Sequence, residues 1–134
     1  MFPPKTKVLV IDDMTSMRKI IISNLKEIGL TNASEAIDGA DAWSTLQKAA
    51  KEGSPFELVL SDWSMPNLTG LELLKKVRTD ENYKTVPFIM VTAEAEQKAV
   101  IEAVQAKVSN YITKPFTVND LRTKIEYTYK KHTT

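Results

Sequence analysis

The chain has 134 residues, no cysteine, and 18 basic against 17 acidic residues, which leaves a formal net charge of +1. The length predicts one domain with its own core, and the missing thiols exclude a disulfide scaffold, cysteine nucleophiles and thiolate metal sites. The balanced charge favours neither nucleic-acid nor membrane-surface binding, and no apolar stretch approaches the roughly 20 residues that span a bilayer, so we expect a cytoplasmic monomer.

The first half of the chain alternates short apolar runs with longer periodic segments. Val8–Ile11 is a continuous apolar run, typical of a strand buried on both faces. Residues 15–29 predict a helix that Gly29 ends in a left-handed turn. A short strand near Ala33–Ile37 follows, and Asp38 caps a second helix that ends before residues 53–55. The inner stripe predicted for the first helix consists of Met17, Ile20, Ile21, Leu25 and Ile28.

The second half repeats this alternation three times. Leu58–Ser61 and Val86–Val91 predict two strands, separated by a helix that opens with the capping box Thr69-Gly70-Leu71-Glu72. Residues 94–107 predict a fourth helix, Tyr111-Ile112 a fifth strand, and residues 118–129 a last helix. The side chains expected to face inward from the fourth helix are Val100, Ala103 and Val104.

Strands that alternate with helices predict an α/β fold, with a parallel sheet covered on both faces by right-handed crossovers. In such sheets ligands bind beyond the carboxyl ends of the strands. The polar residues that follow the apolar runs at this edge are Asp12, Asp13, Asp62, Thr92 and Lys114. Because neighbours within a strand point to opposite faces, Asp12 and Asp13 can share a site only where the first strand has ended.

Three carboxylates, a hydroxyl and an ammonium at one edge indicate phosphoryl chemistry rather than a set of separate helix caps. Close carboxylates repel one another unless a cation intervenes, and hard oxygen ligands suit Mg²⁺. The only histidine, His132, stands near the C-terminus, which argues against zinc. A carboxylate can attack phosphorus to form an acyl phosphate, whose oxygens Lys114 and Thr92 would hold. Pro115 permits a cis bond that would fix the direction of Lys114.

These motifs resemble the receiver domain of two-component response regulators, most strongly its CheY-like chemotaxis members, over nearly the whole chain. The resemblance implies a flavodoxin-like (βα)5 fold, doubly wound, with strand order 2-1-3-4-5. It implies one receiver domain over residues 1–134 and no output domain. The segments that carry it are Asp12-Asp13, Ser61-Asp62-Trp63-Ser64-Met65-Pro66, Met90-Val91-Thr92-Ala93-Glu94-Ala95, Tyr111 and Lys114-Pro115-Phe116.

The resemblance also implies how the acidic residues act. Asp62 is expected to be the phosphoacceptor. The expected direct Mg²⁺ ligands are Asp13, Asp62 and the main-chain carbonyl of Ser64, with Asp12 acting mainly through water. Ser64 replaces a residue that is often Asn in such proteins, and it flanks the phosphoryl site.

Further roles concern the response to phosphorylation. The resemblance implies that Lys114 pairs with a phosphoryl oxygen, that Thr92 moves onto the phosphoryl group, and that Tyr111 turns inward behind it. The changed surface would comprise the fourth helix, the fifth strand and the last helix. Its expected contact residues are Glu94, Tyr111 and Lys124.

The implied function is that of a stand-alone regulator, a phosphoacceptor rather than an enzyme, with self-catalysed phosphorylation and dephosphorylation. The expected partners are a CheA-like histidine kinase, a FliM-like flagellar motor switch protein and a phosphatase. One alternative is a phosphorelay shuttle outside chemotaxis. Another is an aspartyl-phosphate phosphohydrolase of the haloacid-dehalogenase type, which usually carries D-x-D on its first strand, whereas this chain reads Asp12-Asp13-Met14 and has no insertion to cap a substrate.

Three positions outside the site depart from the family pattern. Lys107 stands where a glycine commonly ends the fourth helix, and a left-handed conformation there would cost a non-glycine residue about 1 kcal/mol. Asn110 is the alternative residue for that turn. Glu96-Gln97 stand where CheY-like chains often carry lysines, which bears on the docking partner.

Overall fold

The computed structural model describes residues 1–133, in which five strands alternate with five helices. The strands are β1 (Val8–Ile11), β2 (Ala33–Ala36), β3 (Leu58–Ser61), β4 (Phe88–Thr92) and β5 (Asn110–Thr113). The helices are α1 (Thr15–Glu27), α2 (Gly39–Lys51), α3 (Gly70–Arg78), α4 (Gln97–Gln105) and α5 (Val118–Thr133).

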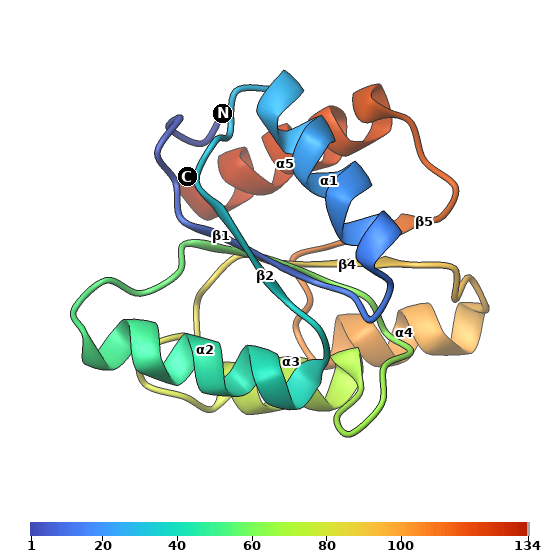
Figure 1. Cartoon of the computed structure of the whole chain (residues 1–134). Coiled ribbons are helices and arrows are strands. Elements are labelled where there is room, and N and C mark those ends of the chain that lie inside the picture. Colours follow the sequence, from blue (N-terminus) through green and yellow to red (C-terminus); the bar gives the residue numbers. More distant parts are fainter. Residues whose placement is uncertain (134) are drawn as a thin grey trace.

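The strands form one sheet in the order β2-β1-β3-β4-β5, and every neighbouring pair is parallel (Figure 1). In the register of the central pair, Ile11 lies opposite Ser61. The chain runs outward from β1 to the edge strand β2 and then returns past β1 to β3, so the loops that follow β1 and β3 lie side by side at the carboxyl edge. The predicted α/β fold and strand order are confirmed.

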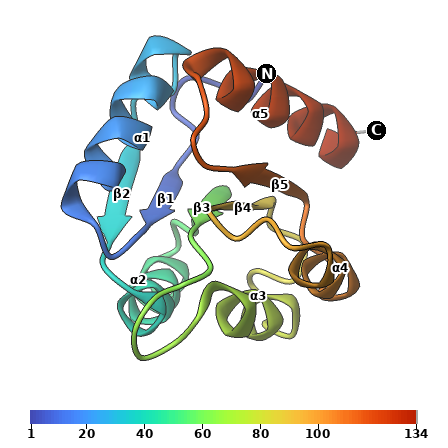
Figure 2. The same ribbon diagram turned by 90° about the vertical axis from the view of Figure 1, so that its right-hand side faces the viewer.

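Helices cover both faces of the sheet, α1 and α5 on one side and α2, α3 and α4 on the other (Figure 2). Each face has its own apolar core. Leu9 and Val59 belong to the core beneath α2 and α3, whereas Val8 and Leu58 belong to the core beneath α1 and α5. Both faces of β1 and β3 are therefore buried, which explains their uninterrupted apolar sequence.

The helix ends follow the polar signals of the sequence. Asp38 caps α2 by accepting a 2.8 Å hydrogen bond from the Asp41 amide. Thr69 and Glu72 form the reciprocal capping box of α3. Gly29 has a φ of +97°, as predicted for the left-handed turn after α1. No helix among residues 1–133 combines the length and apolarity needed to cross a bilayer.

Several local predictions were wrong. The side chains of Ile20 and Val104, expected inside, are 50% and 62% exposed. The inner face of α1 is narrower than predicted and includes Arg18, and the buried residues of α4 are Ala99 and Ala103, one turn apart.

The limits of two elements and one turn also differ from the sequence predictions. The predicted helix over 94–107 starts only at Gln97, and β4 begins at Phe88 instead of residue 86. Lys107 itself takes the left-handed turn with a φ of +68°, because Asn110, the alternative residue, already pairs with β4 as the first residue of β5.

Candidate functional site

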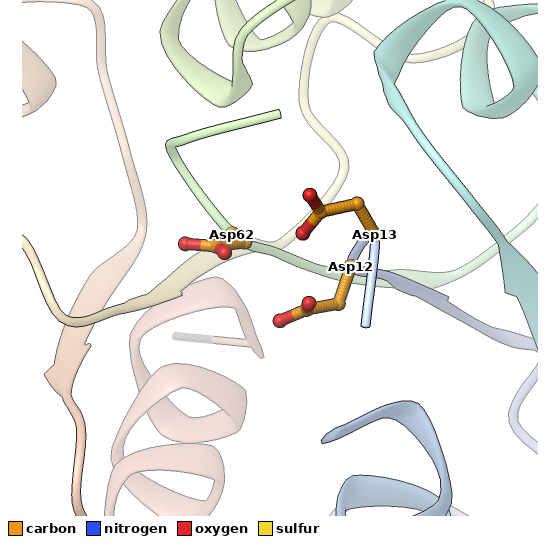
Figure 3. A group of neighbouring side chains, drawn as sticks. All are labelled: Asp12, Asp13 and Asp62. Carbon is orange, nitrogen blue, oxygen red and sulfur yellow. The ribbon is translucent and has the colours of Figure 1, made fainter. Parts of the chain in front are cut away.

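Three carboxylates converge where β1 and β3 end (Figure 3). Oxygen atoms of Asp12, Asp13 and Asp62 all lie within 4.8 Å of one another. The Asp62 amide donates a 3.0 Å hydrogen bond to the Ile11 carbonyl, so the strand pairing itself places the acids together. Asp12 and Asp13 follow the last residue of β1, as the sequence required. Clustered carboxylate oxygens are hard ligands, so this donor set fits Mg²⁺.

Asp12 is the most deeply buried of the three acids, with no exposed surface. Its Oδ2 accepts a 2.8 Å hydrogen bond from Nζ of Lys114, and its Oδ1 accepts one of 2.9 Å from the Met14 amide. Both carboxylate oxygens therefore have a donor. Such a buried charge is tolerated only because it is paired and hydrogen-bonded.

Asp62 is 8% exposed and has one firmly held oxygen and one more weakly held oxygen. Its Oδ1 accepts a 2.7 Å hydrogen bond from the Trp63 amide, whereas its Oδ2 lies 3.4 Å from Nζ of Lys114. Asp62 and Lys114 line an open depression together with Thr92 and Ser64. The carboxylate is therefore accessible from solvent although most of its surface is covered.

Lys114 reaches both acids from the end of β5. Its amide donates a 2.9 Å hydrogen bond to the Thr92 carbonyl, and the Lys114–Pro115 peptide bond is cis. The side chain is only 13% exposed. A lysine held this way cancels part of the negative charge of Asp12 and Asp62.

Thr92 and Tyr111 are linked through one loop. The Thr92 hydroxyl accepts a 3.2 Å hydrogen bond from the Glu94 amide, and the Tyr111 hydroxyl donates one of 2.6 Å to the Glu94 carbonyl. Burial, followed by the charges of Glu94 and Asp62, raises the pKa of Tyr111 to about 12. The phenol therefore stays protonated and able to donate this bond at neutral pH.

The remaining predicted residues lie around the rim. Asp13 is the exposed member of the carboxylate cluster, and Ser64 is exposed at the rim of the depression. Lys124 and Tyr111 line one open cavity between β5 and α5, and Tyr111 in turn contacts Glu94. The three residues expected to form the docking surface are thus contiguous, while their binding role stays a prediction.

Two residues that shape the site were missed in the sequence. Arg18 is buried in α1 and donates a 2.7 Å hydrogen bond from Nη1 to the carbonyl of Asp12. Arg18 stands three residues before Ile21 and seven before Leu25, so it lies on the buried face of α1. An arginine on the apolar face of a predicted helix is the signal that could have identified it.

Gly70 is the second missed residue. A Cβ atom at Gly70 would collide with the carbonyl oxygen of Asp62 and lie 2.9 Å from Cα of Trp63. The Gly70 amide also donates a 2.8 Å hydrogen bond to the Trp63 carbonyl. The first residue of α3 therefore packs directly on the backbone of the proposed phosphoacceptor, which only glycine permits.

Comparison with known proteins agrees with this geometry. Residues 8–126 match the response regulator receiver domain. The chain is 43% identical to the chemotaxis protein CheY of Pseudomonas aeruginosa over 125 residues, which are 93% of this chain and 97% of that protein. It is 41% identical to the chemotaxis protein CheY-3 of Vibrio cholerae, over 93% of this chain and 92% of that protein.

Solved structures give the same result for the fold. The chemotaxis response regulator CheY4 of Vibrio cholerae superimposes with a TM-score of 0.82 at 31% identity, covering 92% of this chain and 98% of that one. A putative response regulator from Chloroflexus aurantiacus superimposes with a TM-score of 0.84 at 25% identity, over 94% of this chain and 98% of that one.

Proposed function

The chain belongs to the response regulator receiver domain family, and from this premise we propose that Asp62 accepts a phosphoryl group while Asp12, Asp13 and Asp62 hold Mg²⁺. The observation that carries the proposal is the convergence of three carboxylate groups within 4.8 Å, next to one lysine. When bound, the cation would neutralise negative charge on the transferring group. The main-chain carbonyl of Ser64, at the exposed rim, is proposed as a further ligand.

Oδ2 of Asp62 is proposed as the nucleophile. Oδ1 is already engaged by the Trp63 amide at 2.7 Å, whereas Oδ2 has only the 3.4 Å contact with Lys114. Attack on a phosphohistidine forms a P–O bond as the P–N bond breaks, and the electron pair of the broken bond returns to the imidazole nitrogen. Later attack by water would release phosphate and restore the carboxylate. The chain is thus proposed to act as a phosphoacceptor that catalyses its own phosphorylation and dephosphorylation.

Lys114 and Thr92 are proposed to bind the phosphoryl oxygens. Both line the depression at Asp62, and Lys114 already lies within hydrogen-bonding reach of it. A Thr92 hydroxyl that turns to the phosphoryl group gives up its bond with the Glu94 amide. The Glu94 carbonyl also holds the Tyr111 hydroxyl, so this loop couples the phosphorylation site to Tyr111.

The output is proposed to be altered binding of a partner at the surface of Glu94, Tyr111 and Lys124. The relatives named as chemotaxis proteins favour a CheA-like kinase as donor and a FliM-like motor switch protein as target, in the cytoplasm. A pull-down from cell extract with beryllofluoride-treated and untreated protein tests this output. Equal capture of a motor switch protein by both forms would contradict it.

The phosphoacceptor itself is tested by mass spectrometry of the intact chain after incubation with a small phosphodonor and Mg²⁺. We expect one added phosphoryl group on the unchanged chain and none on an Asp62→Asn variant. Asp38→Asn is the matched control, because this carboxylate caps α2 instead of joining the cluster. Labelling of Asp62→Asn to the same extent as the unchanged chain would overturn the proposal.

A further inference from the structure

A second polar cavity lies at the edge of the sheet opposite the carboxylate cluster. It is formed where α3, α4 and α5 end and where the chain enters β4 and β5, on the side of the molecule that holds the C-terminus (Figure 1). Four of its lining residues are lysine or arginine, and no carboxylate lines it among the residues that the structure describes. The lining residues used below are Arg78, Lys84, Lys107, Ser109, Lys131 and His132.

Arg78 forms one wall of this cavity and has no carboxylate partner among the ion pairs of residues 1–133. Its Nε donates a 2.9 Å hydrogen bond to the Lys107 carbonyl, and its Nη1 donates one of 2.7 Å to the Val86 carbonyl. Burial lowers the pKa of the Arg78 guanidinium below its ordinary value. The guanidinium is thus held in place by main-chain dipoles while its charge is not neutralised.

Ser109 links Arg78 to His132 at the wall of the cavity. The Ser109 hydroxyl accepts hydrogen bonds of 2.9 Å from the Phe88 amide and 3.3 Å from Nη2 of Arg78, which fill both lone pairs. The Ser109 hydroxyl also shares a 2.9 Å hydrogen bond with Nε2 of His132. Burial and the charges of Arg78 and Lys131 lower the pKa of His132, which favours the neutral imidazole in the absence of an anion.

The cavity keeps a positive surplus after the nearby negative groups of residues 1–133 are counted. Arg78, Lys84, Lys107 and Lys131 supply four positive charges. Glu81, 3.2 Å from Lys84, offsets one of them. The three helix C-termini contribute roughly half a negative charge each, which leaves a surplus of roughly one to two positive charges. The four basic side chains therefore carry more positive charge than is needed to offset the negative ends of the three helices.

We propose that this cavity binds a small phosphate-bearing anion, either inorganic phosphate or the phosphate group of a metabolite. Its side chains have the chemistry of an oxyanion site: one guanidinium of fixed orientation, three lysine ammonium groups and an imidazole that can take up a proton. The site is separate from Asp62, because the two lie at opposite ends of the parallel strands.

His132 provides the test, since it is the only histidine of the chain. Its imidazole resonances are followed by NMR during titration of the metal-free protein, first with inorganic phosphate and then with glycerol phosphate. We expect a saturable change with at least one of them, and an upward shift of the His132 titration midpoint in the bound form. A response to only one anion identifies the source of the phosphate. Drift no larger than that caused by chloride at matched ionic strength overturns the proposal.

Variants separate a bound anion from a general effect of charge. Lys84→Gln combined with Lys131→Gln is expected to weaken binding roughly tenfold, because two donors to the anion are lost. Both side chains lie at the surface, so the fold is retained. Lys26→Gln combined with Lys48→Gln removes the same charge from α1 and α2 and is expected to leave the affinity unchanged. Equal weakening by both pairs would contradict a site in this cavity.

Discussion

Nη1 of Arg18 donates a 2.7 Å hydrogen bond to the main-chain carbonyl of Asp12. Its Nε also pairs with Oε1 of Glu35 at 2.8 Å, and its Nη2 lies 3.2 Å from the Thr15 hydroxyl. The buried guanidinium of Arg18 therefore connects α1 both to Glu35 in β2 and to the loop after β1. This loop carries Asp12 and Asp13, two of the three clustered acids. This places the arginine as a positioning residue for the carboxylates, although it does not touch the open depression itself.

Replacing Arg18 by Met is expected to destabilise the chain and to weaken Mg²⁺ binding. The Asp12 carbonyl would lose its donor in a buried place, which costs about 2 kcal/mol of unfolding free energy. The loop that holds Asp12 and Asp13 would then be less ordered, and the Mg²⁺ affinity should fall severalfold. Denaturant unfolding measures the first effect, and Trp63 fluorescence during Mg²⁺ titration, in a Trp43→Phe background, measures the second.

Glu35→Gln is the control for this prediction. It removes the ion-pair partner of Arg18 but leaves the bond to Asp12, and the Glu35 side chain is 45% exposed. An ion pair in which one partner is this exposed contributes about 1 kcal/mol or less. A Glu35 variant that lowers Mg²⁺ affinity as strongly as Arg18→Met would assign the effect to the ion pair.

Gly70→Ala is expected to displace the backbone of Asp62 by direct contact. The added methyl group collides with the Asp62 carbonyl, so the start of α3 must move and the unfolding free energy should fall by about 2 kcal/mol. Phosphorylation of Asp62 should slow as well. Gly29→Ala is the comparison: its φ is +97° and nothing lies within 4 Å of a Cβ there, so strain of about 1 kcal/mol should appear without slower phosphorylation. Equal phosphorylation rates in both variants would argue against the contact.

Lys114→Gln is expected to separate Mg²⁺ binding from phosphorylation. The ammonium lies 2.8 Å from Asp12 and 3.4 Å from Asp62, so its removal takes away a positive charge that competes with the cation. Mg²⁺ should bind severalfold more tightly, while phosphorylation should slow on the order of 100-fold because a donor to the phosphoryl group is lost. Trp63 fluorescence and intact-mass labelling give the two readouts. Weaker Mg²⁺ binding would contradict the predicted competition.

The raised pKa of Tyr111 should make the unfolding free energy depend on pH in the alkaline range. The pKa of Tyr111 is raised to about 12, and an unfolded tyrosine titrates near 10. Between these values the folded chain retains a proton that the unfolded chain has lost, so stability falls as pH rises through this window. In Tyr111→Phe the part of the stability loss that comes from this phenol should be absent. The comparison is the change in unfolding free energy between pH 9 and pH 11 in both proteins; an equal change would contradict the raised pKa.

Local sequence was sufficient for the elements that carry strong apolar runs or explicit caps. The uninterrupted apolar residues of β1 and β3 could only be strands buried on both faces, and Thr69 with Glu72 fixed the start of α3. The weaker pattern of α4 misled, because its inner face is made by Ala99 and Ala103, whose small side chains add little to periodicity. Val104 was therefore assigned to the wrong face.

By itself, the sequence determined which residues could take part in phosphoryl chemistry, since three acids, a threonine and a lysine stand at the ends of four separate strand patterns. Only the tertiary structure decided how they meet: strand pairing sets Asp62 beside Asp12, and Lys114 reaches both across 102 and 52 residues of chain. It also decided the supporting contacts of Arg18 and Gly70. Such contacts depend on how closely a helix packs against a loop, and the periodicity of apolar residues along the chain carries no information about that separation.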